Sequence, residues 1–426
     1  MNHLSLYIHI PFCVRKCNYC DFLSAPCTEE TKQKYVEALC MEITRRAKKF
    51  KDRKVDTIFF GGGTPSILSA EQFEKIMTVI KQGFYVFKEA EISLELNPGT
   101  VDWNKLQTYY KFGVNRLSIG LQSADNEELK ILGRIHTWET FVRTWNMVRT
   151  VGFSNVNIDL MSALPGQTAE SYENTLRKVL ALKPEHISAY SLIIEEGTKF
   201  YEWFGEEAEK EICSIEDIQA SNFDDRNTEL RMKKLPDEIT DRRMYEMTRE
   251  LLEQHGYYRY EISNYALEGY ECKHNVGYWK RKEYLGLGLG AASLIANVRS
   301  SNVSDLTEYL DQEQKIKEDN ILEAKEKVIT QQGGKISRKE NRTGEWDELS
   351  IKDQMEEFMF LGLRMMEGVS VDEFEKQFGK SLQEVYGKQI SKLEKQGLLR
   401  FNEEEHRYAL TIQGIDVSNQ VFVEFI

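Results

Sequence analysis

Hydrophobic residues in the first half of the chain recur in short, β-rich runs, and polar–apolar stretches of helical period separate these runs. The runs cover residues 4–10, 57–62, 92–98, 116–123, 156–166 and 186–194. Strands that alternate with helices in this way form βαβ units and a parallel sheet. Six such units predict an incomplete TIM-like (β/α)6 barrel of class α/β, rather than an open doubly wound sheet.

The pattern changes after residue 200 and indicates further domains. The predicted divisions are a core barrel over 1–200, a barrel extension over 201–330 with an inserted loop at 205–234, a linker over 331–349, and a C-terminal domain over 350–426. Within the extension, "LPDEITDRRMYEMTRELLEQHGY" predicts a helix that begins at Asp237 or Thr240. The last segment combines helical patterns with a hairpin-like "GLLRFNEEEHRYALT", which predicts a mainly helical, winged-helix-like domain.

Composition and charge narrow the class of protein. The hydrophobic fraction of 41% is typical of globular proteins, and no apolar run is long enough to span a bilayer. The first residues, "MNHLSLYIHIPF", lack the features of a signal peptide, so a cytoplasmic location is expected. The net charge of −13 disfavours nucleic acid as a partner. For the winged-helix-like segment we therefore favour packing or partner recognition.

Polar and glycine residues follow successive predicted strands. They are Gly61, Gly62, Gly63 and Thr64, then Glu95 and Asn97, then Gln122, then Asp159. In a parallel barrel the carboxyl ends of the strands share one mouth, where sites assemble. Any one of these residues is also compatible with an ordinary strand-to-helix turn. Their recurrence at four strands favours a site at that mouth.

Three cysteines lie close together just after the first run. Cys13, Cys17 and Cys20 form a C-x3-C-x2-C cluster in a chain of seven cysteines, which indicates metal binding rather than a disulfide framework. A structural zinc ion takes four ligands, so this set would need a distant histidine to complete it. An iron–sulfur cube held by three thiolates keeps one iron open to a small molecule.

The same cysteine spacing is the signature of the radical S-adenosylmethionine (SAM) superfamily. Together with "YIHIPFC", "CNYCDF", "FFGGGTPS", "SIGLQS" and "DLMSALPGQT", the first 200 residues resemble the oxygen-independent coproporphyrinogen III oxidase family. The choice of a partial radical SAM barrel over an open doubly wound sheet rests partly on this resemblance. The resemblance implies that the three cysteines hold a [4Fe–4S] cluster. It also implies that SAM chelates the open iron and is cleaved to a 5′-deoxyadenosyl radical after reduction.

Further site residues are implied by the positions of the family motifs. For SAM they are Tyr7, Tyr19 against the adenine, Gly62, Gly63 and Thr64 at the methionine end, and Glu95 at the ribose. Gln122, Arg134 and Asp159 match positions that contact a second SAM molecule in the oxidase. Read without the resemblance, Tyr7 could simply fill a strand and Arg134 could be a solvated helix charge. No residue is assigned a catalytic role.

Two features separate the chain from the true oxidases. Phe22 stands where they carry a fourth cysteine, and only twelve residues precede Cys13. Both features resemble the heme chaperone (HemW) branch, whose second mark, H-N-x-x-Y-W, is present as "HNVGYW". The residues of this tentative heme region are His274, Asn275, Tyr278 and Trp279. His274 is the candidate axial ligand, Cys272 is a weaker one, and His274 could instead shape the pocket while another residue binds iron.

This resemblance implies a heme chaperone that delivers heme to an acceptor hemoprotein, such as a membrane-bound respiratory enzyme. The electron donor would be a flavodoxin or a ferredoxin, and the location cytoplasmic, with peripheral contact at the inner membrane face. The radical site would gate heme transfer or oligomeric state. The alternatives are a decarboxylase that converts coproporphyrinogen III to protoporphyrinogen IX, and a radical SAM enzyme with an unrelated substrate.

Overall fold

The computed structural model describes residues 3–205, 234–316 and 346–426. The predicted inserted loop at 205–234 and most of the predicted linker at 331–349 lie outside the described residues. No helix in the described part of the chain is long and apolar enough to cross a membrane.

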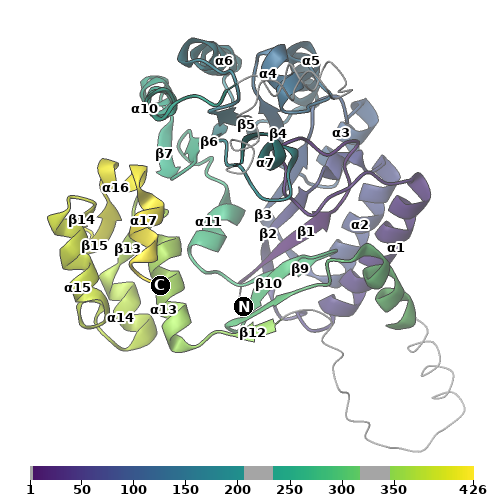
Figure 1. Ribbon diagram of the computed structural model, residues 1–426. Coiled ribbons are helices and arrows are strands. Elements are labelled where there is room, and N and C mark those ends of the chain that lie inside the picture. Colours follow the sequence, from purple (N-terminus) through teal and green to yellow (C-terminus); the bar gives the residue numbers. More distant parts are fainter. Residues whose placement is uncertain (1–2, 206–233, 317–345) are drawn as a thin grey trace, which may run out of the picture.

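A parallel sheet forms the centre of the larger domain (Figure 1). Its six parallel strands pair in chain order: β1 (His3–Ile10), β2 (Lys54–Gly62), β3 (Tyr85–Leu96), β4 (Arg116–Gln122), β5 (Val156–Ser162) and β6 (His186–Ser191). This arrangement confirms the partial barrel of six β/α units.

Shorter strands extend the sheet at both edges. Beyond β6 lie β8 (Asn264–Ala266) and β7 (Tyr258–Glu261), both antiparallel. On the other side β9 (Tyr284–Leu287) is parallel to β1, and β10 (Ala292–Ile295), β11 (Val298–Ser301) and β12 (Trp346–Glu348) follow antiparallel. The barrel is therefore an open, curved sheet whose edges are β12 and β7.

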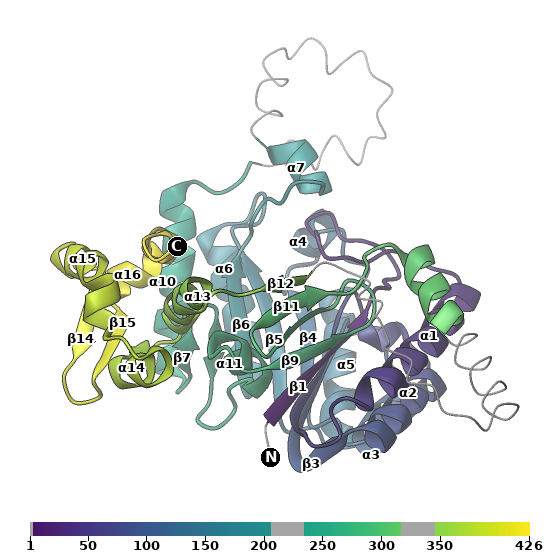
Figure 2. The same ribbon diagram turned by 90° about the horizontal axis from the view of Figure 1, so that it is seen from below.

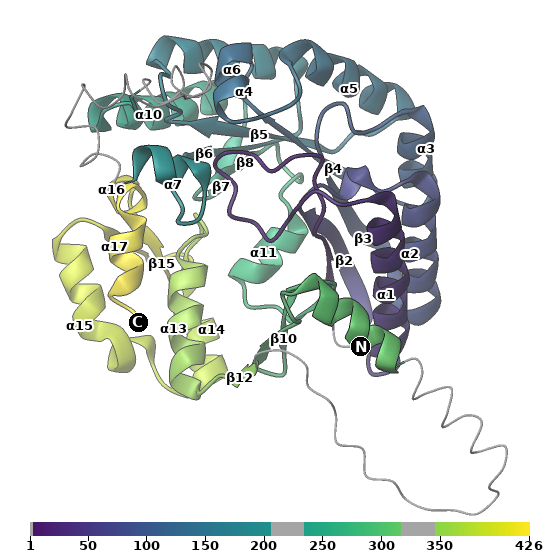
Figure 3. The ribbon, with the colours of Figure 1, turned by 45° about the vertical axis from the view of Figure 1, so that its right-hand side comes forward.

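Helices cover the outer face of this sheet (Figure 3). They are α1 (Glu29–Ala47), α2 (Ala70–Gly83), α3 (Trp103–Lys111), α4 (Asn126–Ile131), α5 (Trp138–Val151), α6 (Ala169–Leu182) and α10 (Glu238–Gln254), with the short η1 (Pro65–Ile67). The short α7 (Lys199–Phe204) lies instead beside the loop that follows β1. Each of the seven α-helices on the outer face begins at a Ser, Thr or Asp whose side chain accepts a backbone N–H of the first turn. Asp237 caps α10, so the first of the two predicted start positions is confirmed.

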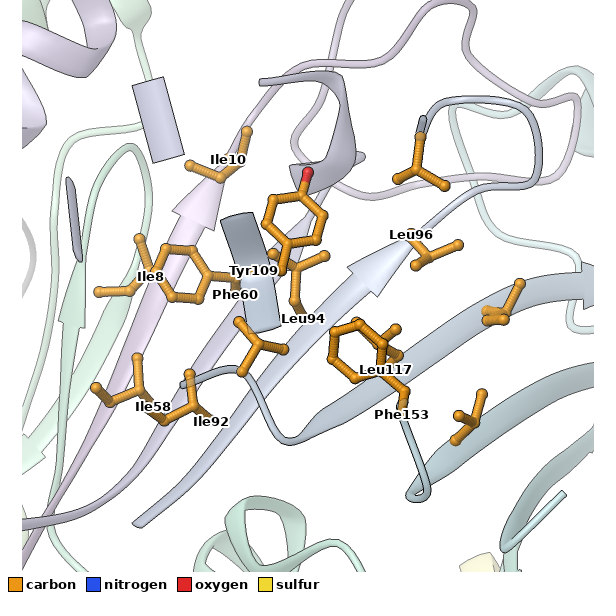
Figure 4. Close-up of a cluster of buried hydrophobic side chains, with 14 of the residues drawn as sticks. Ile8, Ile10, Ile58, Phe60, Ile92, Leu94, Leu96, Tyr109, Leu117 and Phe153 are labelled. Carbon is orange, nitrogen blue, oxygen red and sulfur yellow. The ribbon is translucent and has the colours of Figure 1, made fainter. Parts of the chain in front are cut away.

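Alternation along the strands separates an apolar face from a polar one. The outward residues of β1 to β3 are fully buried against the helices, and Figure 4 shows Ile8, Ile10, Ile58, Phe60, Ile92 and Leu94 side by side. The intervening residues, such as Tyr7, His9 and Glu95, face the other side of the sheet. A β-strand places successive side chains on opposite faces, so the polar set lines the barrel interior.

The C-terminal domain has its own hydrophobic core around Phe374, Ile390 and Leu399. Its elements are α13 (Ile351–Gly362), β13 (Val369–Ser370), α14 (Val371–Phe378), α15 (Leu382–Lys395), β14 (Leu399–Asn402), β15 (Arg407–Leu410), α16 (Ile412–Asp416) and α17 (Ser418–Val423). The order helix, strand, two helices and hairpin confirms the winged-helix-like prediction, and the three strands form one sheet in the order β13-β15-β14.

The short helix α11 (Lys273–Trp279) lies between the sheet and the C-terminal domain (Figures 1 and 2). Arg281, two residues after the helix, links the two: it donates from Nε to Glu357 of α13 at 2.7 Å. A second joint lies at the sheet edge, where the amide of Met366 donates to the Tyr260 carbonyl at 3.0 Å. The C-terminal domain is therefore attached at the amino ends of the barrel strands.

Candidate functional site

The three clustered cysteines lie in one loop at the carboxyl end of β1. The loop closes on itself, since the amide of Cys13 donates to the Ala25 carbonyl at 3.2 Å and the amide of Ala25 donates to Pro11 at 3.0 Å. Cys13, Cys17 and Cys20 are half-buried, and none is in a disulfide. Phe22, at the position of the oxidase's fourth cysteine, is 61% exposed.

Asn18 fixes this loop to two neighbouring elements. Its amide donates to the Leu132 carbonyl at 3.0 Å, its side chain donates to Ile131 at 2.8 Å, and its own carbonyl accepts from Phe200 of α7 at 2.9 Å. Sequence reasoning missed Asn18, because the C-x3-C-x2-C pattern does not specify a residue type at its position. Its role depends on contacts with residues far away in the chain.

The loop suits a multi-iron cluster better than a single metal ion. In the described part of the chain, no three His, Cys, Asp or Glu side chains are close enough to hold one metal ion. A four-iron cube does not need three side chains around a single metal atom, because each thiolate binds a different iron. Burial raises the pKa of the Cys20 thiol, and the sulfurs of Cys17 and Cys13 raise it further. Iron would supply the positive charge that lets these thiols ionise together.

The glycine turn after β2 packs directly onto the cysteine loop. A Cβ on Gly63 would lie 2.7 Å from the Phe12 carbonyl oxygen, and one on Gly62, at φ +106°, would lie 2.5 Å from the His9 ring. Adjacent segments of the same polypeptide leave no room for a side chain at these positions. Glycine is therefore required here whether or not a ligand also approaches the turn. The hydroxyl of Thr64 donates to the Cys13 sulfur at 3.4 Å, which joins the turn to the cluster loop.

Glu95 lies at the end of β3 inside the barrel. Burial, and then the nearby Asp159 carboxylate, raise its pKa to about 8, although the Gly62 amide hydrogen bond opposes this. A Cβ on Gly61 would contact both Glu95 and Tyr7, which places these three together. The Tyr7 hydroxyl is 3.1 Å from Nδ1 of His9, whose Nε2 is 2.9 Å from the Leu23 carbonyl. The structure therefore brings these polar residues together inside the barrel, next to the segment that ends the cysteine loop.

Arg134 also reaches the cysteine loop. Its guanidinium donates to Asn97 Oδ1 at 2.6 Å, to the Gly120 carbonyl, and to the Cys17 sulfur at 3.7 Å. The reading of Arg134 as a solvated helix charge is therefore wrong. Asn97, noted in the sequence only as a strand-end residue, holds both Arg134 and Thr64.

Tyr19 and Gln122 also lie at the carboxyl end of the barrel strands, where the cysteine loop is. Tyr19 packs on Phe200 with ring centroids 6.4 Å apart, and burial raises the pKa of its hydroxyl. Gln122 ends β4 with a φ of +74° beside a register shift, and its side chain accepts from the Tyr190 hydroxyl at 3.1 Å. A non-glycine residue in the left-handed region costs free energy and is common at functional sites.

Asp159 departs from its predicted position. It is the fourth residue of β5 (Val156–Ser162), not a residue at its end. Its carboxylate accepts from Asn157 at 2.7 Å and from Ser118 at 3.1 Å, and burial raises its pKa. The sequence pattern places Asp159 among the residues that follow predicted strands, whereas the strand continues for three residues beyond it. Asp159 thus lies deeper in the barrel than the residues at the carboxyl ends of the strands.

The HNVGYW segment forms most of α11, at the opposite end of the barrel. His274 is 1% exposed, with Nδ1 at 2.8 Å from the Thr57 hydroxyl and Nε2 at 3.0 Å from the Tyr278 hydroxyl. Burial lowers its pKa to about 3, so the ring is neutral. Cys272 is also buried and points to Glu91, which accepts the amides of Lys273 and His274. Neither ring nitrogen of His274 is open to iron in this conformation.

Of the remaining motif residues, Trp279 faces the C-terminal domain. The guanidinium of Arg364 lies 4.3 Å from the centroid of its ring. Asn275 is half-buried.

Aromatic rings connect α11 to the residues near the cysteine loop. Ring centroids are 6.3 Å apart for Tyr7 and Phe59, 5.0 Å for Phe59 and His274, and 4.8 Å for His274 and Tyr278. Tyr7 also approaches His274 directly, at 6.5 Å. The two predicted functional regions are separate, but a continuous column of packed rings joins them through the barrel.

Comparison with known proteins places these features in a family context. Residues 7–179 match the radical SAM superfamily, and residues 349–417 match the HemN C-terminal domain. Heme chaperone HemW of Lactococcus lactis is 36% identical over 99% of this chain and 97% of its own length. The protein of that name from Bacillus subtilis is 34% identical over 99% of both chains. Among solved structures, coproporphyrinogen III oxidase (HemN) from Escherichia coli superimposes with a TM-score of 0.77 at 24% identity, covering 100% of this chain and 90% of that one.

Proposed function

This chain belongs to the HemW family of heme chaperones within the radical SAM superfamily, and from that premise we propose that it binds heme and delivers it to an acceptor hemoprotein. The observation that carries the proposal is identity of 34–36% over nearly the whole of two heme chaperones. The oxidase likeness, at 24% identity, concerns the fold alone.

The cofactors of this family are a [4Fe–4S] cluster and SAM, with heme as cargo. Cys13, Cys17 and Cys20 would bind three irons of the cluster, and the fourth iron would take SAM. When bound and reduced, the cluster supplies an electron to SAM. The loop fits this group because its three thiols share one half-buried loop that Asn18 holds in place.

The residues around the loop would position SAM. Gly62, Gly63 and Thr64 present a turn at the cluster, Tyr19 offers an aromatic face, and Glu95 offers an acceptor for hydroxyl groups. Tyr7 supports Glu95 from β1. Gln122, Arg134 and Asp159 lie around the same interior, but Arg134 and Asp159 already have protein partners. We propose one SAM site and a structural role for these last two residues.

The heme region we place at α11, on the far side of the barrel. The His274 ligand remains a hypothesis, and the burial of its ring favours the alternative in which it shapes the pocket. Asn275, Tyr278 and Trp279 would support the same wall. We further propose a respiratory hemoprotein as acceptor, a flavodoxin or ferredoxin as electron donor, and a cytoplasmic location with peripheral contact at the inner membrane face.

A heme titration of the anaerobically reconstituted protein tests the proposal. We expect a saturable Soret band and transfer of the bound heme to an apo-hemoprotein. An assay with coproporphyrinogen III, SAM and a reductant should yield no protoporphyrinogen IX, because Phe22 replaces the oxidase's fourth cysteine. Formation of protoporphyrinogen IX without saturable heme binding would contradict the chaperone function and show that the protein is a decarboxylase.

Glu95 gives the proposed SAM pocket a pH dependence. Its folded pKa of about 8 lies above the ordinary value near 4.5, so the folded state retains a proton that the unfolded chain releases, and stability falls as pH rises from about 4.5 to about 8. Glu95→Gln, which imitates the protonated form, should stabilise the ligand-free protein by on the order of 2 kcal/mol at pH 9 and leave it unchanged at pH 5; partial solvation reduces the full value of 1.36 kcal/mol per pKa unit. Urea unfolding at both pH values measures this.

The control is Glu89→Gln, since Glu89 lies on the same strand but is exposed. It should change stability equally little at both pH values. An identical pH response of the Glu95 and Glu89 variants would contradict the raised pKa.

A further inference from the structure

A large cavity opens at the amino ends of the barrel strands, opposite the cysteine loop. It has a volume of about 980 Å³, and residues of β1, β2, β3, β7 and α11 line it together with residues 365–367 of the C-terminal domain. Because His3, Leu4 and Ser5 line the cavity, residues 6–10 of β1 separate it from the cysteine loop, by roughly 17 Å at the usual rise per strand residue. Its size lies at the upper end of the range for small-molecule sites.

The apolar walls of this cavity come from both domains. They are formed by Leu4, Phe87, Tyr258, Tyr260, Val276 and Met365. Met365 is held in place by two backbone contacts. It forms an isolated β-bridge with Glu261, and the amide of Met366 donates to the Tyr260 carbonyl. Aromatic rings, aliphatic side chains and a thioether suit a flat, apolar macrocycle.

His3 offers a metal-binding nitrogen at the edge of the cavity. Its Nδ1 is paired with the Asp56 carboxylate, which Lys54 also approaches at 3.6 Å. A carboxylate on one ring nitrogen is the usual support of a metal-binding histidine, because it fixes the ring and directs the other nitrogen to the metal. The His274 ring, by contrast, has both nitrogens engaged.

Two lysines supply positive charge at the cavity: Lys273 is the first residue of α11, and Lys282 lies three residues beyond its last. Lys273 and Lys282 are exposed, and neither forms an ion pair with another described residue, whereas Lys280 pairs with Glu367 at 2.8 Å. Glu89 and Glu271 also line the cavity. The lysine pair can therefore receive two carboxylates of a ligand.

We propose that the heme cargo sits in this cavity, with Nε2 of His3 as its axial ligand and Lys273 and Lys282 at its propionates. This inference rests on the proposed function and adds its binding site. It also assigns the C-terminal domain one wall of that site, so that movement of this domain would open the cavity for transfer.

The ligand is tested by titrating ferric hemin into the anaerobically reconstituted protein and following the Soret band. His3→Ala should shift the band and weaken binding at least tenfold, and Asp56→Asn should weaken it about tenfold through the loss of the supporting carboxylate. The matched control is His406→Ala, because His406 is likewise exposed and paired with a carboxylate, Asp372, at 2.7 Å, but lies in the C-terminal hairpin.

The proposed contacts of the two lysines with the heme propionates are tested with charge-reversal variants and with a ligand that lacks the propionate charges. The double variant Lys273→Glu and Lys282→Glu should bind hemin at least tenfold more weakly, while Lys388→Glu with Lys395→Glu on α15 should bind it normally. Hemin dimethyl ester, which lacks the propionate charges, should bind the parent and the first double variant equally. Equal binding of hemin itself by these two proteins would overturn the assignment of the propionates.

The outcomes separate this inference from the proposed function. Absence of saturable hemin binding by the parent would overturn both. Normal binding and an unshifted Soret band in His3→Ala, with loss in His274→Ala, would overturn the His3 assignment and leave the chaperone function standing.

Discussion

Replacement of Cys17 by alanine is expected to abolish the broad visible absorption of the reconstituted iron–sulfur cluster. A cube held by only two thiolates leaves a second iron without a protein ligand, and Arg134 would then face an empty position instead of the Cys17 sulfur. Iron and acid-labile sulfide should fall to a small fraction of the parent values, and SAM cleavage should fall at least a hundredfold. Absorption spectra and iron analysis under anaerobic conditions measure the change.

Cys27→Ala is the matched control. The bridge between Phe12 and Ala25 brings the chain back beside the cysteine loop, so Cys27 is half-buried close to Cys13, yet it lies outside the C-x3-C-x2-C pattern. This variant should keep full iron content. A Cys17 variant with unchanged colour, or a Cys27 variant without colour, would show that the ligand set is assigned wrongly.

The fold could be predicted well because its signals are local. Period-two alternation and regular turns specify six β/α units, and capping residues such as Asp237 specify where helices begin. The edge strands β7 to β12 were not predicted individually. They are three or four residues long, and such short segments carry too little periodicity to distinguish a strand from a turn.

The candidate site was predictable at the level of motifs but not of contacts. The cysteines and the glycine turn stand in recognisable order, whereas Asn18, Asn97 and the depth of Asp159 depend on strands that meet only in the folded barrel. The reason for glycine at position 63 is likewise tertiary, since the obstructing atom is a carbonyl oxygen of Phe12.

The largest gap between sequence and structure concerns the HNVGYW segment. Its composition suggests heme, but the fold buries His274 against Thr57 and Tyr278 and directs Trp279 and Arg281 toward the C-terminal domain. The segment therefore connects the barrel to the C-terminal domain, and it also lines the cavity between them. Packed rings also connect His274 to Tyr7 through Phe59. A movement of Tyr7 near the cysteine loop could therefore be transmitted by side-chain contacts to the joint between the domains.

Glu357→Gln is expected to weaken that joint strongly. One carboxylate oxygen accepts from Arg281 and the other from Arg299, each at 2.7 Å, and the side chains of Glu357 and Arg281 are both 6% exposed. Removing the charge of one partner leaves a buried guanidinium uncompensated, which typically costs 3–5 kcal/mol. We expect about 3 kcal/mol lower stability in urea unfolding, and faster proteolytic separation of the C-terminal domain.

The adjacent Glu356→Gln is the control, because Glu356 pairs with Lys352, whose side chain is 78% exposed, one turn away on the same helix. Only 12% of the Glu356 side chain is exposed, but its cation Lys352 remains in solvent, so the substitution leaves no buried charge without a partner. Ion pairs with a solvated member contribute little, so this variant should lose much less stability than Glu357→Gln. If both variants unfold alike, the buried pair does not hold the domains together. If Glu357→Gln loosens the C-terminal domain and also weakens hemin binding while Glu356→Gln does neither, the joint and the heme cavity act as one unit.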